Sequence, residues 1–120
     1  MVVRIELTDD ETDRLFHALA AATRRDILRR TLEHEQSVSA LATAYDMSFA
    51  GVQKHVAVLE AAGLIVKRAE GRERLVRADP TMIARARALL AAYEDLWRTR
   101  IDQLDELLAE PTSPSTTQGE

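Results

Sequence analysis

The stretch MSFAGVQKHVAVLEAAGLI, residues 47–65, decides the fold of this chain. It predicts a helix over residues 48–62 with Ser48 as the N-cap, since a serine hydroxyl accepts a hydrogen bond from a free amide of the first turn. Gly63 follows the predicted helix, where glycine tolerates the left-handed backbone that commonly ends one. Both ends of the helix are therefore marked by residues suited to those positions.

The two faces of this predicted helix differ in character. At 100° per residue, Val52, Val56 and Leu59 lie together, as the buried side of a helix should. Gln53 and His55 lie on opposite flanks of the other side. The residues that face away from the core are mainly small: Ala50, Gly51, Lys54 and Ala57. Such a face permits close approach to a bulky surface.

Two runs of β-forming residues follow the helix. Residues 64–68 and 73–77 are joined by residues 69–72, in which Gly71 suits a turn. This pattern predicts a β-hairpin. Its tip and edges carry the basic residues Lys67, Arg68, Arg72, Arg74 and Arg77.

Three helices are predicted before residue 47. The first begins at Thr8, which forms a capping box with Glu11. The segment Thr23 to Asp26 repeats the cap pattern, and Ser39 is placed to cap a short third helix after the polar residues 33–37. Their buried sides are predicted to carry Leu15, Phe16, Leu19, Ala22, Ile27, Leu28, Leu32, Leu41, Ala42 and Tyr45.

An apolar stripe marks the C-terminal part of the chain. Asp79 and Pro80 predict the start of a helix, because proline is tolerated in the first turn. A small domain has little core left to cover so long a stripe, which favours a second chain as its partner over packing within one chain. Residues 111–120 have the composition of a disordered tail, so the folded domain is expected to span residues 1–110. The stripe consists of Ala86, Leu90, Tyr93, Trp97, Ile101, Leu104 and Leu108.

Composition limits the class of protein. The chain has 120 residues and no cysteine, which indicates one domain and excludes a disulfide framework or a thiolate metal site. No membrane span or signal peptide is visible, so a cytoplasmic protein is expected. The net charge of −4 hides a basic centre, because residues 14–87 hold 13 Lys and Arg against 8 Asp and Glu. Such a centre suits an anionic partner.

The order of these elements is that of a winged helix-turn-helix, mainly α-helical with a small β-hairpin as the wing. In this fold the second helix of the pair lies in the major groove of DNA. Gln53 and Lys54 carry donors for base edges or phosphates, and wing arginines suit phosphates or the minor groove. We therefore expect double-stranded DNA to be bound by Ser48, Phe49, Ala50, Gln53, Lys54, His55, Arg68, Arg72 and Arg74.

Some nearby side chains have two interpretations. His55 is expected either to contact a phosphate or to pack between helices with a bond to backbone. Arg24 and Arg25 are candidates for DNA-backbone contacts or intramolecular salt bridges, and the salt bridges are favoured. Gly51 costs roughly 1 kcal/mol of helix stability relative to alanine. Close approach to DNA and chance are equally good explanations of that glycine.

Two parts of the chain resemble the ArsR/SmtB family of bacterial regulators. LFHALA at residues 15–20 and TRRDIL at residues 23–28 are similar to the opening of these proteins, and residues 47–65 to their recognition helix and the start of their wing. The resemblance covers about residues 12–108. It implies a homodimeric DNA-binding repressor with a palindromic operator, in which the first and last helices pair between protomers. The implied interface comprises Leu15, Leu90, Tyr93, Trp97, Ile101, Leu104 and Leu108.

The resemblance does not extend to metal sensing. Many members of the family bind metal through cysteines, or through His and carboxylate pairs on the last helix. This chain has no cysteine and no histidine after His55. The carboxylates of its last helix, Asp95, Asp102, Asp105 and Glu106, are by themselves poor ligands for zinc, nickel or cobalt. We expect no metal and no cofactor, and an unknown small-molecule inducer is compatible with the sequence.

Two other functions fit the same elements. One is a winged helix that docks a protein partner through the same face. The other is a repressor with a small-molecule pocket between the dimer helices, around Tyr93 and Trp97. An enzyme is not expected, because no nucleophile elbow, phosphate-binding glycine loop or histidine–carboxylate pair at helical spacing occurs.

Overall fold

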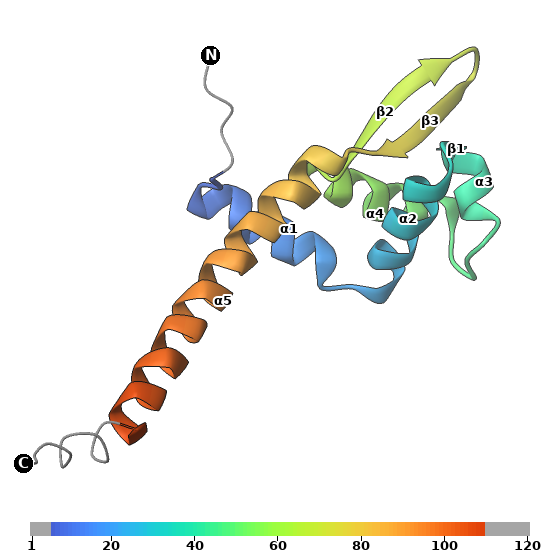
Figure 1. Ribbon diagram of the computed structural model, residues 1–120. Coiled ribbons are helices and arrows are strands. Elements are labelled where there is room, and N and C mark those ends of the chain that lie inside the picture. The colour runs from blue at the N-terminus through green and yellow to red at the C-terminus, as the bar shows by residue number, and fades with distance from the viewer. Residues whose placement is uncertain (1–5, 110–120) are drawn as a thin grey trace, which may run out of the picture. The chain divides into compact units, whose positions relative to one another are not determined.

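The computed structural model describes residues 6–109, so the predicted tail at residues 111–120 lies outside the described part (Figure 1). The chain divides into two units, Met1–Arg87 and Ala88–Glu120. The described elements are α1 (Asp9–Leu19), α2 (Ala22–Glu33), β1 (Gln36–Ser37), α3 (Val38–Ala42), α4 (Phe49–Ala61), β2 (Ile65–Glu70), β3 (Glu73–Ala78) and α5 (Pro80–Ala109). A mainly helical fold with a small antiparallel sheet is thereby confirmed.

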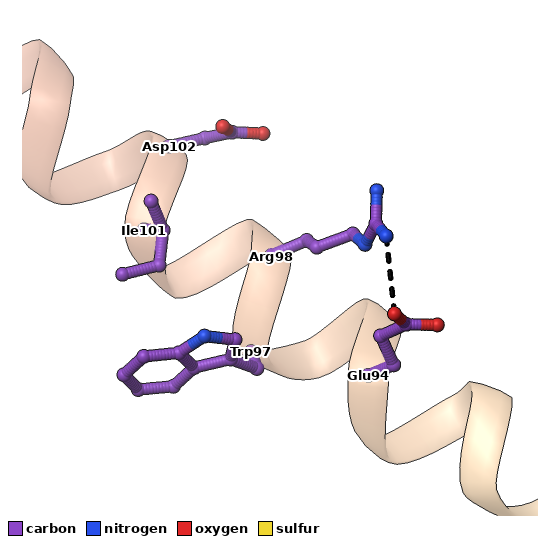
Figure 2. Close-up of a pocket in the computed structure, with 5 residues that line it drawn as sticks. All are labelled: Glu94, Trp97, Arg98, Ile101 and Asp102. Atoms are coloured by element: carbon purple, nitrogen blue, oxygen red, sulfur yellow. Dashed lines mark hydrogen bonds and ion pairs between the residues drawn. The ribbon is translucent and has the colours of Figure 1, made fainter.

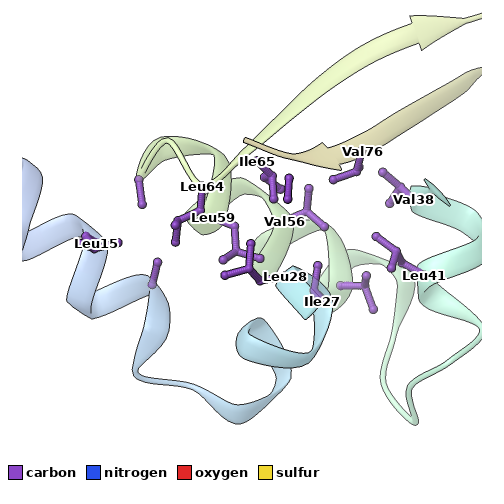
Figure 3. Close-up of a cluster of buried hydrophobic side chains, with 14 residues drawn as sticks. Leu15, Ile27, Leu28, Val38, Leu41, Val56, Leu59, Leu64, Ile65 and Val76 are labelled. Carbon is purple, nitrogen blue, oxygen red and sulfur yellow. The ribbon is translucent and has the colours of Figure 1, made fainter. Parts of the chain in front are cut away.

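The first unit is built on one hydrophobic core to which helices and sheet both contribute (Figure 3). Val52, Val56 and Leu59 are buried, so the predicted inner face of α4 is confirmed. Phe16, Leu32 and Ala22 were predicted to be buried, and this was wrong. Phe16 and Leu32 are 41% and 52% exposed, and Ala22 is exposed because it begins α2 rather than continuing α1. The core consists of Leu15, Ala18, Ile27, Leu28, Val38, Leu41, Val52, Val56, Leu59, Ala62, Leu64, Ile65, Val76 and Ala78.

Leu15 corrects one part of the predicted dimer interface. Its side chain has no exposed surface and lies in the core of its own chain, so it is not available to a second protomer. The amphipathic pattern of α1 does not say which neighbour covers its apolar side. In the folded chain that side packs within the first unit, and Phe16, one residue on, is the exposed apolar side chain.

Hydrogen bonds at the helix N-termini confirm the caps predicted at Thr8 and Ser48 and correct those predicted at Thr23 and Ser39. Thr8 and Glu11 form the capping box, with bonds of 3.1 and 2.9 Å between side chain and backbone. The cap predicted at Thr23 is wrong, because α2 begins at Ala22 after Ala21, which supplies no side-chain cap. The cap of α3 is Ser37 rather than Ser39, since the chain passes directly from β1 into the helix.

The wing is a three-stranded antiparallel sheet in the order β1-β3-β2. The predicted hairpin is confirmed as β2 and β3, with Gly71 at a φ of +62° in the turn between them. The short strand β1 was not predicted, because its two polar residues lack any strand pattern. It forms because Gln36 and Ser37 pair with Val76 and Leu75 of β3, which fastens the wing to the helices.

An ion cluster around Asp26 ties α2 to the segment between α3 and α4. The Tyr45 hydroxyl donates to Oδ2 of Asp26 at 2.6 Å, and Arg29 and Arg30 each donate to the same carboxylate at 2.8 Å. These bonds, that of Tyr45 foremost, hold the pKa of Asp26 well below its usual range. Burial, followed by the bond to Asp26, raises the pKa of Tyr45 to about 12. Tyr45 was predicted on the third helix, but that helix ends at Ala42.

Replacing Tyr45 by phenylalanine is expected to lower the free energy of unfolding by about 1–2 kcal/mol, since a hydrogen bond to a charged group is lost. The difference should be fully present above about pH 4, where Asp26 is ionised even when unfolded. It should fade as the pH falls through the lower folded-state pKa of Asp26, because a depressed carboxyl pKa stabilises only the ionised form. Urea unfolding at several pH values measures this.

Tyr93→Phe is the matched control, because the Tyr93 hydroxyl has no hydrogen bond to residues 6–109 and phenylalanine keeps the ring that Tyr93 contributes to the apolar stripe. Its free energy of unfolding should equal that of the parent. A Tyr45→Phe variant as stable as the parent at neutral pH would show that the cluster does not stabilise the fold.

Candidate nucleic-acid interface

The N-terminus of α4 is fixed by Ser48. Its Oγ accepts from the backbone amide of Gly51 at 3.0 Å, as predicted for a helix cap. A β-carbon at Gly51 would lie 3.3 Å from that oxygen, so the capped turn itself favours glycine at this position. At the other end, Gly63 has a φ of +80° and follows the last residues of the helix, as predicted.

The predicted exposed face of α4 is present. Val52, Val56 and Leu59 turn inward, while Gln53 and Lys54 are exposed beside the small residues. Neither polar side chain forms a hydrogen bond or ion pair with residues 6–109, so both are available to a ligand. We call the six predicted DNA-binding residues of this region the reading surface: Ser48, Phe49, Ala50, Gln53, Lys54 and His55. All are exposed except His55, which is half-buried.

The partner of His55 is a side chain rather than backbone. Nη1 of Arg24 lies 3.1 Å from Nδ1 of His55. Arg24 also donates to the carbonyls of Ala18 and His17, and Arg25 donates to that of Leu19 at 2.7 Å. The salt bridges favoured for both arginines are therefore absent among the described residues. The arginines instead satisfy carbonyls at the end of α1, where cations are favoured.

The arginines of the wing are of two kinds, those without an ion pair and one that is paired with carboxylates. Arg72 and Arg74 are exposed, and neither has an ion pair within residues 6–109. Arg68, also predicted to bind DNA, donates from two nitrogens to Glu35 at 2.9 and 3.0 Å and from a third to Glu70 at 2.9 Å. Arg68 thus braces β2 against the segment before β1, and a phosphate contact there must compete with two carboxylates.

This difference predicts unequal effects of two arginine substitutions on DNA binding. Arg74→Ala should weaken binding by severalfold or more and reduce the salt dependence, since each lost phosphate contact lowers the slope by about 1. Arg68→Ala should change both quantities less, because its charge is already balanced by Glu35 and Glu70. Titrations of labelled DNA at several salt concentrations compare the two variants, and a larger effect of Arg68→Ala would contradict the assignment.

The second unit presents the predicted apolar stripe. Leu90, Tyr93, Trp97, Leu104 and Leu108 are 44–78% exposed, and Ile101 is half-buried. Figure 2 shows Trp97 and Ile101 on one side of α5, and Arg98 paired with Glu94 at 3.0 Å on the other. The residues around Trp97 border only an open depression. Ala86, the first residue of the stripe, belongs to the first unit and packs against its core.

In the described part of the chain, no three His, Cys, Asp or Glu side chains converge to hold a metal ion. No helix between residues 6 and 109 is long and apolar enough to cross a membrane.

The Asp26–Tyr45 cluster and the Arg24–His55 contact were missed by sequence reasoning, because each joins residues far apart in the chain.

Comparison with known proteins gives relatives of one kind, although no family model matches the chain. The chain is 37% identical over 81 residues to an HTH-type transcriptional regulator of Mycobacterium tuberculosis, a match that covers 68% of this chain and 76% of the relative. Its fold is similar to the crystal structure of an ArsR family transcriptional regulator, with 31% identity and a TM-score of 0.73 over 78% of this chain and 96% of that one.

A third similarity concerns assembly as well as fold. The solution structure of a homodimeric winged helix-turn-helix DNA-binding domain from Mycobacterium bovis is 29% identical. The TM-score is 0.59, and the match covers 79% of this chain and 91% of that domain. The wing and the capped helix described above are thus found in a chain whose relatives bind DNA or regulate transcription.

Proposed function

The chain belongs to the ArsR family of DNA-binding transcriptional regulators, and from this premise we propose that it acts as a homodimeric repressor on a palindromic operator. The observation that carries the proposal is the exposed, unpaired pair Gln53 and Lys54 on a helix capped by Ser48. In the proposed complex α4 enters the major groove, and Arg72 and Arg74 of the wing contact the flanking backbone.

The roles within the reading surface follow from side-chain chemistry. The amide of Gln53 can donate to N6–N7 of adenine and accept from it, which makes it the base-reading residue. Lys54 is a point charge for a phosphate. Ser48 accepts from Gly51 and keeps its hydroxyl proton for a phosphate at the helix N-terminus. The small side chains around them leave room for the groove wall.

The proposed dimer uses the exposed stripe of α5. Apolar side chains such as Trp97 and Leu104 are unfavourable in water, and a second copy of the same helix buries them. A two-fold dimer presents two copies of α4 to a palindromic operator, whose half-sites we expect about one helical turn apart. The homodimeric relative from Mycobacterium bovis supports this assembly.

The regulatory signal in this proposal is not a metal ion, because the sequence contains no cysteine and no three potential metal ligands converge within residues 6–109. A zinc titration followed by the fluorescence of Trp97, the single tryptophan, tests this part. The spectrum and the affinity for DNA should be the same with and without zinc. A zinc-dependent loss of DNA binding would contradict it.

Fluorescence anisotropy against DNA from upstream of the protein's own gene, with scrambled competitor, tests the function as a whole. Lys54, Arg72 and Arg74 of both protomers imply a slope of log affinity against log salt of about −5. Binding should survive competitor and fall steeply with salt, and transcription from that DNA in vitro should decrease when the protein is added. A folded dimer that binds no DNA at any salt would instead favour the protein-docking alternative.

A further inference from the structure

The guanidinium of Arg24 connects the end of α1 to α4. Its Nε donates to the carbonyl of Ala18 at 2.8 Å, and its Nη2 donates to that of His17 at 2.9 Å. Its Nη1 lies 3.1 Å from Nδ1 of His55, which is 31 residues further along the chain. The last carbonyls of a helix carry partial negative charge, so the cation is held at α1 both by hydrogen bonds and electrostatically.

This contact determines the tautomer of His55. Arginine has only N–H donors and is not deprotonated in proteins, so Nδ1 of His55 must be the acceptor. A neutral imidazole with its lone pair on Nδ1 carries its proton on Nε2. Arg24 therefore decides which ring nitrogen of His55 is a donor.

The Nε2 of His55 is not fully buried and has no partner in the described part of the chain. The only buried side-chain nitrogen or oxygen without a partner there is Nε of Arg85. His55 lies on the flank of α4, beside the exposed face that carries Lys54. A donor on the flank of a helix in the major groove meets the phosphates that border the groove.

We propose that Arg24 is a positioning residue for DNA binding: it holds Nδ1 of His55, so that Nε2–H of His55 donates to one phosphate oxygen of each half-site. The inference rests on the proposed function, because it uses α4 as the reading helix. Arg24 itself stays with the carbonyls of α1. His55 contributes a directional neutral hydrogen bond, which complements the point charge of Lys54.

Two substitutions of His55 separate its nitrogens. The amide of asparagine reaches the place of Nδ1 only, whereas the amide of glutamine reaches the place of Nε2. With a duplex operator selected by the parent protein from a random DNA library, His55→Asn should bind about tenfold more weakly per half-site, and His55→Gln should retain most of the affinity. Arg24→Lys should resemble His55→Asn, since one ammonium cannot replace the guanidinium fork.

The location of the contact is tested by replacing the operator phosphates one at a time with neutral methylphosphonates. At one phosphate per half-site, replacement should weaken binding by the parent, because the hydrogen bond from His55 is lost. The same replacement should not weaken binding by His55→Asn or Arg24→Lys. Nitrogen-15 NMR should find the Nε2–H tautomer in the free parent and a tautomer mixture in Arg24→Lys. Thermal unfolding verifies that each variant is folded. If Arg24→Lys does not fold, the comparison of His55→Asn with His55→Gln tests the proposal.

Several results would overturn the proposal. One is equal affinity of the parent and His55→Asn, and another is an Nδ1–H tautomer in the parent. A phosphate whose replacement matters in His55→Asn but not in Arg24→Lys would show that Arg24 contacts it directly. If Gln53→Ala and Lys54→Ala also bind like the parent, the proposed reading surface has failed. If those two bind weakly while the His55 and Arg24 variants do not, only the present inference has failed.

Discussion

Replacing Trp97 by alanine is expected to weaken dimerisation by on the order of a thousandfold. Trp97 lies in the middle of the apolar stripe of α5 and is 59% exposed in the single chain, so its large ring has no cover of its own. Truncating a central interface aromatic costs about 2 kcal/mol or more, and a two-fold dimer loses two of them. Sedimentation equilibrium over a range of protein concentrations measures the dissociation constant.

Thr99→Ala is the matched control for this substitution. Thr99 is on the same helix but about 200° around it from Trp97, and it too is exposed. Its dimer constant should equal that of the parent. The helical content of both variants should be unchanged, which separates loss of the interface from loss of α5. A Trp97→Ala variant that dimerises as tightly as the parent would contradict the assignment of the stripe to the dimer.

Replacing Gln53 or Lys54 by alanine is expected to weaken operator binding in two distinguishable ways. Gln53→Ala should cost about tenfold or more per half-site and relax the preference for the base that Gln53 reads, since a bidentate base contact is lost. Lys54→Ala should weaken binding to specific and scrambled DNA alike, and lower the salt slope by about 1 per half-site. Competition titrations with single-base operator variants measure both effects.

The dimer constant of these variants should remain that of the parent, because both side chains lie on the exposed face of α4 in the first unit. Arg14→Ala removes an exposed cation from α1, outside the reading surface, and is the matched control for Lys54→Ala. Its salt slope should equal that of the parent. Operator binding as tight as the parent's by either Gln53→Ala or Lys54→Ala would show that the reading surface is wrongly placed.

The sequence predicted well wherever the deciding interactions lie within a few residues. The capping box of Thr8 and Glu11, the cap at Ser48 and the left-handed Gly63 each depend on neighbours no more than four positions away. Helical periodicity likewise placed Gln53 and Lys54 on the exposed side of α4, because the angle between successive residues is fixed. These local rules were sufficient for the winged helix-turn-helix order and for most of the candidate DNA-binding surface.

Local rules were misleading where a distant partner competed. Ser37 caps α3 because β1 pairs with β3, and Leu15 is buried because its own chain covers it. Arg68 has a side chain suited to a phosphate, yet it donates instead to Glu35, 33 residues away in the chain. The partners of these residues are not among their near neighbours in the sequence, so periodicity and composition could not find them.

By itself, then, the sequence determined which segments become helices, where the β2–β3 hairpin lies, which face of α4 is exposed, and which face of α5 is apolar. The tertiary structure alone decided which polar side chains far apart in the chain are partnered. It joined Asp26 to Tyr45, Arg68 to Glu35, and Arg24 to His55 across 19, 33 and 31 residues. The physical reason is that backbone conformation follows from neighbours in the chain, whereas the hydrogen bonds of a long, flexible side chain are settled by whichever groups folding brings within about 3 Å of it.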